Sequence, residues 1–261
     1  MRRAFPNKYE LYTLCVQAPE RLAAFLAAVH GGLPRSLRED FAGPAAVCGA
    51  WVEQSPDATA TAVDFDPEPL SFAPQDPRVR KVVADVMKSR AKADVIAALN
   101  FPIGYWHTRA ELVAYFRHAR ACLKRGGVLV FDMYGGSDAW EPSVAKARFR
   151  TDSGKRVVYE WEQIEANPLT GLVHNAIHFT VEGAKRGAAP RRIRGAFEYH
   201  WRLWSIPELR EALEDAGFAR VEVYSRLGEA MDSDGRLYVR PMDDHDVLDA
   251  DWVVYVAGRV R

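Results

Sequence analysis

The sequence predicts an α/β protein whose main domain is a doubly wound, mostly parallel sheet, with a second, antiparallel sheet inserted into it. Short apolar segments alternate with amphipathic helical segments over residues 36–132 and again over 205–257, as in a parallel sheet with helical crossovers. Over residues 147–204 the pattern changes to strict alternation, which is typical of half-buried strands. We therefore expect N-terminal helices and the first part of the main domain at 1–146, the inserted sheet at 147–204, and a return to the main domain at 205–261.

The predicted strands of the main domain are short, and most are apolar. The first, Ser36–Asp40, is the exception, because Leu37 is its only strongly apolar residue and a central parallel strand usually reads as a continuous apolar run. Each strand of the inserted sheet shows one apolar, aromatic face. The main-domain strands are expected at residues 36–40, 59–65, 79–83, 93–99, 128–131, 218–224 and 252–257, and the inserted ones around 157–161, 177–181 and 197–203, with turns at 167–171 and 183–190.

Capping signals place the helices between these strands. Pro19 opens a helical pattern that Gly31 closes, and a second apolar-periodic piece precedes it. We expect Pro44 to occupy a first helical position, and Asp66 to cap the following helix. Capping boxes then begin two amphipathic helices, at Thr108–Glu111 and Ser205–Glu208.

Composition limits the classes of partner. The 261-residue chain has 35 basic and 35 acidic residues, so charge gives no reason to expect a nucleic acid or an anionic membrane as partner. The three cysteines are far apart, which argues against a disulfide framework or a zinc knuckle. We expect a cytoplasmic protein without a signal peptide or a membrane span, and no metal site. The oligomeric state stays open.

The stretch Arg38–Val47 directs attention to a cofactor. It places an acid at a strand end, follows it with a turn of small residues, and leads into a helix. The second strand also ends in acids, Asp64 and Asp66. This order holds nucleotide-like cofactors at the mouth of doubly wound sheets. A lysine-containing phosphate loop is absent, as is the Gly-x-Gly-x-x-Gly turn of dinucleotide-binding proteins.

These residues resemble the motifs of the class I S-adenosylmethionine-dependent methyltransferases. The first motif of that family is an acid followed by glycines at the second, fourth and sixth positions. The corresponding residues are Glu39, Phe41, Gly43 and Ala45, so one glycine is retained. Leu37–Phe41 and Asp132–Gly136 also look like an uncharacterised bacterial branch of the family.

The later motifs carry the resemblance further, over about residues 35–135 and 205–258. It implies that Asp64 bonds the ribose hydroxyls, that Phe65 packs on adenine and that Asp85 reads the adenine amino group. Asn100 ends the fourth strand and joins the cofactor-binding candidates. The family fold is Rossmann-like, with the last strand antiparallel, and its cofactor is S-adenosyl-L-methionine.

The inserted sheet suggests where an acceptor binds. If its aromatic face packs on the main domain, its polar face carries Glu160, His178 and His200, and we expect that face to cover the methyl site with His178 or His200 as general base. A solvent-facing polar face is the alternative. Tyr9 and Tyr12 either close over the cofactor or belong to a flanking core, and Asp132 is a further base or hydrogen-bond acceptor.

The predicted function is methyl transfer to an N, O or C nucleophile of a small molecule. Neutral charge and an insertion after the fifth strand favour a small acceptor, because in similar enzymes such an insertion builds the acceptor pocket. Three alternatives remain: a non-catalytic S-adenosylmethionine-binding protein, a nucleic-acid or protein methyltransferase, and a nicotinamide oxidoreductase.

Overall fold

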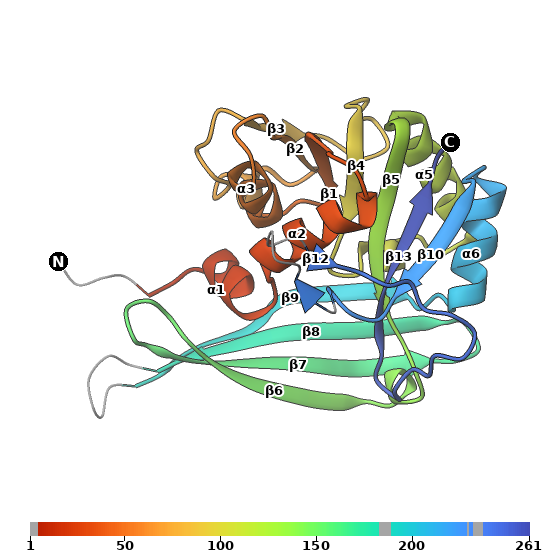
Figure 1. The fold of residues 1–261 in the computed structure, drawn as a ribbon. Helices are drawn as coiled ribbons and strands as arrows, with labels where there is room; N and C mark the ends of the chain where they lie inside the picture. Colours follow the sequence, from red (N-terminus) through yellow and green to blue (C-terminus); the bar gives the residue numbers. More distant parts are fainter. Residues whose placement is uncertain (1–4, 183–188, 229, 232–236) are drawn as a thin grey trace.

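The main domain is a seven-stranded sheet with helices on both faces (Figure 1). The computed structural model describes residues 5–182, 189–228, 230–231 and 237–261. The strand order is β10-β13-β5-β4-β1-β2-β3, and β13 runs antiparallel to both of its neighbours. The predicted mostly parallel sheet with an antiparallel last strand is therefore confirmed. The strands are β1 (Ser36–Asp40), β2 (Thr59–Asp64), β3 (Val79–Val83), β4 (Ala93–Ala98), β5 (Leu123–Tyr134), β10 (Arg220–Tyr224) and β13 (Val253–Arg259).

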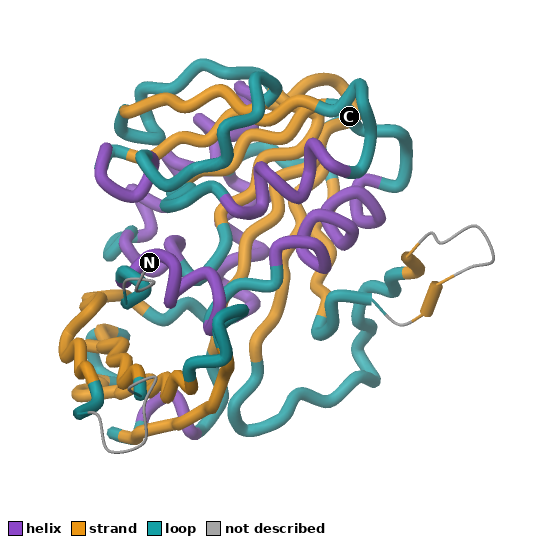
Figure 2. The backbone as a smooth tube through the Cα atoms, turned by 90° about the vertical axis from the view of Figure 1, so that its left-hand side faces the viewer, coloured by secondary structure: helices purple, strands orange, loops and turns teal. Residues whose placement is uncertain are grey.

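Two apolar cores lie on opposite faces of this sheet, and the helices are divided between them (Figure 2). The helices α2 (Pro19–His30), α3 (Ala46–Glu53) and α4 (Pro67–Leu70) pack on one face. The helices α5 (Arg109–Cys122) and α6 (Ile206–Asp215) pack on the other. No helix within the described ranges is long and apolar enough to cross a membrane.

The capping signals mark the helix starts well, with one exception. Thr108 and Ser205 each form a complete capping box, and the Asp66 side chain accepts a hydrogen bond from the Glu68 amide. The helix after β1 begins at Ala46, not at Pro44 as predicted. The reason is Ala45, whose left-handed conformation (φ +54°) separates Pro44 from the helix.

Strand β1 is a central strand in which three consecutive charged residues are buried. Arg38 and Asp40 point to the α5 side and form an ion pair at 2.7 Å with no side-chain exposure. Arg38 also donates to the carbonyls of Val86 and Ser89, and Asp40 accepts from Tyr115. Because successive residues of a strand face opposite sides, the intervening Glu39 lies on the α3 side. These partners explain how a strand with one large apolar residue occupies the centre of the sheet.

The inserted sheet has four antiparallel strands and lies along one end of the main domain (Figure 1). The strands are β6 (Ser143–Arg150), β7 (Arg156–Asn167), β8 (Leu172–Val181) and β9 (Arg191–Arg202). The sequence missed β6, whose inward positions include the small residues Ala145 and Ala147. Most of the expected turn at 183–190 lies outside the described residues.

Short elements complete the chain. Helix α1 (Lys8–Cys15) packs against the inserted sheet through the fully buried Leu11. The 3₁₀ helices η1 (Pro102–Tyr105) and η2 (Asp138–Trp140) follow β4 and β5, and β11 (Ala230–Met231) pairs with β12 (Leu237–Tyr238). Helix η1 contacts both sheets, through β5 and β9.

We predict that Arg38→Met lowers the free energy of unfolding by about 3–5 kcal/mol, because Asp40 stays buried without its charged partner. Urea denaturation followed by circular dichroism measures this change. The control is Arg80→Met on the exposed side of β3, which should change the free energy by no more than about 0.5 kcal/mol. A loss below about 1 kcal/mol for Arg38→Met would contradict a structural role for the pair.

Candidate functional site

The loop between β1 and α3 has an unusual backbone. Phe41, Gly43 and Ala45 all have positive φ, of 58°, 51° and 54°, and the two non-glycine residues are strained by about 1–2 kcal/mol each in this conformation. The Glu39 carboxylate accepts a hydrogen bond from the Cys48 amide at 3.1 Å and so ties the end of β1 to the first turn of α3. We refer to Glu39–Ala45, the stretch for which the sequence predicts cofactor binding, as the cofactor loop.

Gly43 and Asp64 form the centre of the candidate site. The Gly43 amide donates to Asp64 Oδ2 at 2.8 Å, and the Asp66 amide donates to Asp64 Oδ1 at 3.0 Å. Each carboxylate oxygen has a second lone pair, so Asp64 can also accept from a ligand. A methyl group placed on Gly43 would meet no heavy atom within 4 Å. The backbone there borders open space beside an oriented carboxylate.

The other predicted cofactor residues lie around this centre, with different exposures. The Phe65 ring is 73% exposed directly after Asp64. Asp85 is exposed, and its side chain caps the turn after β3 by accepting from the Met87 amide. Ala45 is fully buried, and the Phe41 ring packs 6.1 Å from the ring of Tyr105. Phe41 and Ala45 therefore shape the loop through their backbones.

A second strained turn follows β4. Asn100 and Phe101 have φ of 69° and 67°, and both amides donate to the Asp132 carboxylate, at 2.9 and 2.7 Å. Asp132 thus acts as a hydrogen-bond acceptor that holds this turn. Burial raises the pKa of Asp132 to about 7, although these hydrogen bonds oppose the shift.

The aromatic face of the inserted sheet covers the carboxyl ends of the main-domain strands. We call this face the aromatic roof; it comprises Tyr159, Trp161, Phe197, Tyr199 and Trp201, which the strand register places on one side. The Trp201 ring lies 5.9 Å from the rings of both Phe101 and Tyr105. Asn175, on the same side, donates to the Tyr134 hydroxyl at 2.9 Å.

His178 and His200 lie on the opposite face of the inserted sheet. His178 pairs with Glu162 at 2.8 Å and accepts from the Gly195 amide, and His200 stacks on His174 at 4.2 Å. The sequence interpretation placed the polar face over the methyl site, but the aromatic face lies there. The structure therefore does not bring either histidine to the site.

Three tyrosines bound the space between Asp64 and the aromatic roof. Tyr9 donates to Glu68 at 2.8 Å, and its ring lies 5.8 Å from that of Phe197. Burial raises the pKa of Tyr12 above its ordinary range, and its ring lies 5.0 Å from that of Phe197. Tyr105, on the η1 side, is close enough to Asp64 for the carboxylate to help raise its pKa, after burial. Helix α1 therefore joins α4 to the roof.

Tyr105 is the site residue that the sequence analysis missed. Nothing in the pattern of the residues after the fourth strand indicates that Tyr105 stacks against the roof.

The site combines buried carboxyls with apolar walls. Burial raises the pKa of Glu39 to about 7 and also raises that of Asp64. Among the described residues, no three His, Cys, Asp or Glu side chains converge in a way that could hold a metal ion. The arrangement can accept hydrogen bonds from a hydroxylated ligand at Asp64 and hold an uncharged group under aromatic rings.

We predict that the free energy of unfolding falls as pH rises from about 5 to 7. The Asp132 pKa is about 7 in the fold against 3.8 without burial, so the folded state binds more protons than the unfolded state over this range. One such group contributes a slope of up to about 1.4 kcal/mol per pH unit. Asp132→Asn should reduce the slope measured by urea denaturation, whereas Asp57→Asn, on an exposed turn, should not. If the free energy of unfolding changed equally with pH in the wild type, Asp132→Asn and Asp57→Asn, the raised pKa of Asp132 would be contradicted.

Several solved structures of known proteins are similar to this fold. No protein-family model matches the sequence, and a search of curated proteins finds no match either. Solved structures similar to this chain include an S-adenosylmethionine-dependent methyltransferase from Clostridium acetobutylicum, with 16% identity, a TM-score of 0.68, and coverage of 95% of this chain and 96% of that chain.

Two further solved structures extend the likeness over the whole chain. An amino pentose methyltransferase from Micromonospora echinaspora, solved with S-adenosylmethionine bound, shares 18% identity with a TM-score of 0.68 and full coverage of both chains. A sugar N-methyltransferase from Streptoalloteichus shares 19% identity with a TM-score of 0.65, covering 100% of this chain and 96% of that chain. The chain therefore has the fold of these methyltransferases, inserted sheet region included.

Proposed function

We propose that the protein binds S-adenosyl-L-methionine at the cofactor loop and transfers its methyl group to a small molecule held under the aromatic roof. The observation that carries the proposal is the pair Gly43 and Asp64. An open backbone position lies beside a carboxylate that is fixed by two amides and retains free lone pairs. The pair lies at the carboxyl ends of adjacent parallel strands, where this class of fold binds nucleotides.

The residues around this pair fit an adenosyl ligand. We propose that Asp64 accepts hydrogen bonds from the ribose hydroxyls and that the exposed Phe65 ring packs on the adenine. The open side of Gly43 suits the methionine portion. Asp85 and Asn100 remain proposed contacts at the adenine and acceptor sides. We assign Glu39 a positioning role, since its carboxylate already bonds the Cys48 amide.

The residues around the proposed acceptor favour catalysis by positioning of the nucleophile. S-adenosylmethionine, held by the cofactor loop and Asp64, would supply an electrophilic methyl group on a sulfonium for transfer to the acceptor. The aromatic roof, Tyr12 and Tyr105 would exclude water and orient the acceptor. The histidines of the inserted sheet face away, so we propose an acceptor whose nucleophile is already unprotonated, such as a neutral amine.

Charge and the similar solved structures support the proposal of a small-molecule acceptor. The chain carries no net charge, which disfavours a nucleic-acid acceptor. Two of the similar solved structures are described as acting on sugars, and amino sugars are therefore the first acceptors to test. A non-catalytic binding protein is the second candidate, favoured by Phe41 and Ala45 at two glycine positions of the family motif. Such a protein would bind S-adenosylmethionine but would form no S-adenosylhomocysteine with any acceptor.

We predict that S-adenosylmethionine and S-adenosylhomocysteine both bind in calorimetry, and that Asp64→Asn weakens them about 10- to 100-fold. The substitution removes a charged acceptor, and hydrogen bonds to charged groups contribute about 1.5–3 kcal/mol. Asp57→Asn is the matched control and should bind like the wild type. Absence of binding to the wild type at millimolar concentration would exclude the proposed function.

We predict that amino sugars support release of S-adenosylhomocysteine, measured by mass spectrometry together with the methylated product. Tyr105→Leu should lower kcat/KM about 100-fold, because small displacements of a reacting group are costly in positioning catalysis. His178→Gln, on the opposite face of the inserted sheet, should keep kcat/KM within about twofold of the wild type. If kcat/KM fell strongly in His178→Gln and stayed unchanged in Tyr105→Leu, the polar face of the inserted sheet, and not the aromatic roof, would have to cover the acceptor.

A further inference from the structure

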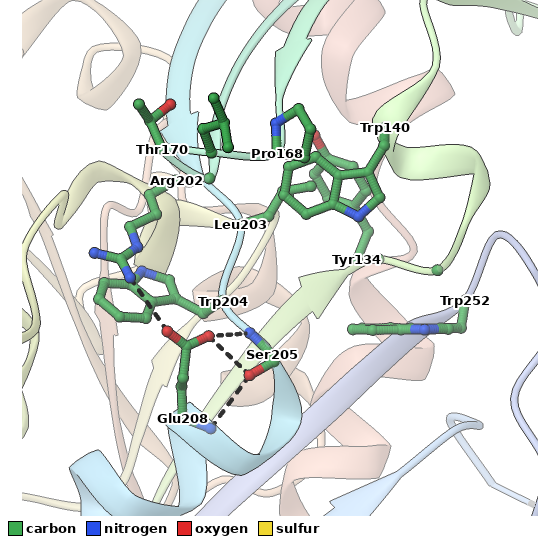
Figure 3. Close-up of a pocket in the computed structure, with 14 residues that line it drawn as sticks. Tyr134, Trp140, Pro168, Thr170, Arg202, Leu203, Trp204, Ser205, Glu208 and Trp252 are labelled. Atoms are coloured by element: carbon green, nitrogen blue, oxygen red, sulfur yellow. Dashed lines mark hydrogen bonds and ion pairs between the residues drawn. The ribbon is translucent and has the colours of Figure 1, made fainter.

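A separate cavity of about 310 Å³ lies where the inserted sheet joins the main domain (Figure 3). Its walls come from both connections between the two sheets, at Tyr134–Trp140 and Arg202–Glu208, and from the β7–β8 turn at Pro168–Gly171. The volume is at the small end of the roughly 300–1,000 Å³ typical of ligand pockets. Neither Gly43 nor Asp64 lines it. We call it the junction pocket.

Four aromatic side chains contribute to its walls. Trp140, Trp204, Trp252 and Tyr134 all line the pocket, and Figure 3 shows them approaching it from different sides. The Trp252 ring packs directly on the backbone of Gly135, where a side chain would collide with it. This contact fixes the indole as part of the wall.

Charged groups occupy one side of the pocket. The Arg202 guanidinium lies 3.8 Å from the centre of the Trp204 ring and pairs with Glu208 at 3.2 Å. The Glu208 carboxylate also accepts from the amide and hydroxyl of Ser205, which leaves lone pairs free. Arg202 Nε has no hydrogen-bond partner among the described residues. The side chain of Thr170 adds a hydroxyl to the same side (Figure 3).

We propose that the junction pocket binds a saccharide ring of the methyl acceptor. A sugar ring has apolar C–H faces and a rim of hydroxyls, which matches aromatic walls combined with a carboxylate, a guanidinium and a hydroxyl along one side. Arg202 already donates to Glu208 and to the His107 carbonyl. A wholly apolar ligand would still leave the buried Arg202 Nε without an acceptor, whereas a sugar hydroxyl can supply one.

The position of the pocket relates this ring to the proposed methyl site. Tyr134 lines the pocket, and its ring also lies 6.1 Å from Trp161 and 6.4 Å from Trp201 of the aromatic roof. A ring bound in the pocket is therefore separated from the roof by one side chain. This inference rests on the proposed function only in making the ring part of the acceptor; saccharide binding itself needs no cofactor.

The test is titration of the cofactor-free protein with methyl β-D-glucopyranoside, methyl β-D-galactopyranoside and methyl β-D-xylopyranoside, followed by NMR and calorimetry. We expect at least one glycoside to bind with a Kd of about 1 mM. Trp140→Leu and Trp252→Leu should each weaken it at least tenfold. Glu208→Gln, which keeps the capping box of α6, should weaken it about tenfold without loss of stability. Leu33→Ala, at a remote exposed position, should bind like the wild type.

The outcomes separate this inference from the proposed function. Cofactor binding is measured in the same proteins, and we expect every pocket variant to bind S-adenosylhomocysteine like the wild type. Failure of all three glycosides to bind at a concentration tenfold above the expected Kd would overturn the pocket inference, whether or not the cofactor binds. Binding of cyclohexanol in place of the glycosides would overturn it as well, since it would make the pocket a site for apolar rings.

Discussion

The structure depends on the buried charges of β1. Arg38 and Asp40 neutralise each other at the centre of the sheet, and Arg38 reaches the carbonyls of Val86 and Ser89 while Asp40 reaches Tyr115 of α5. This pair therefore links the central strand, the segment after β3 and the helix layer on one face. On the other face, Glu39 holds the first turn of α3. One strand of five residues thus fixes the cofactor loop from both sides of the sheet.

Buried carboxylates also stabilise the two strained turns at the site. Phe41, Ala45, Asn100 and Phe101 hold left-handed conformations that residues with a Cβ seldom adopt. Such strain persists where the surroundings over-determine it, and here Glu39 and Asp132 each hold one turn through backbone amides. The turns are therefore preorganised around the space beside Gly43 and Asp64, below the aromatic roof. That arrangement suits chemistry that depends on position and on exclusion of water.

Much of the fold could be predicted from the sequence, because apolar periodicity and capping residues are local signals. The seven strands of the main sheet and the caps at Asp66, Thr108 and Ser205 follow from such signals. The start of α3 does not, because the left-handed Ala45 depends on tertiary contacts. The β6 strand was missed because its inward residues include alanines. The two histidines were misplaced because alternation reveals that a sheet has two faces, but not which face meets the main domain.

The most direct measurement is hydrogen–deuterium exchange of the whole protein with and without S-adenosylhomocysteine. We propose that the cofactor lies against the cofactor loop and the end of β2. We expect slower exchange at amides within residues 41–48 and 64–68, and unchanged exchange at His174, His178 and His200, whose side chains lie on the polar face of the inserted sheet. Protection at the histidine-bearing strands without protection of residues 41–48 would contradict it.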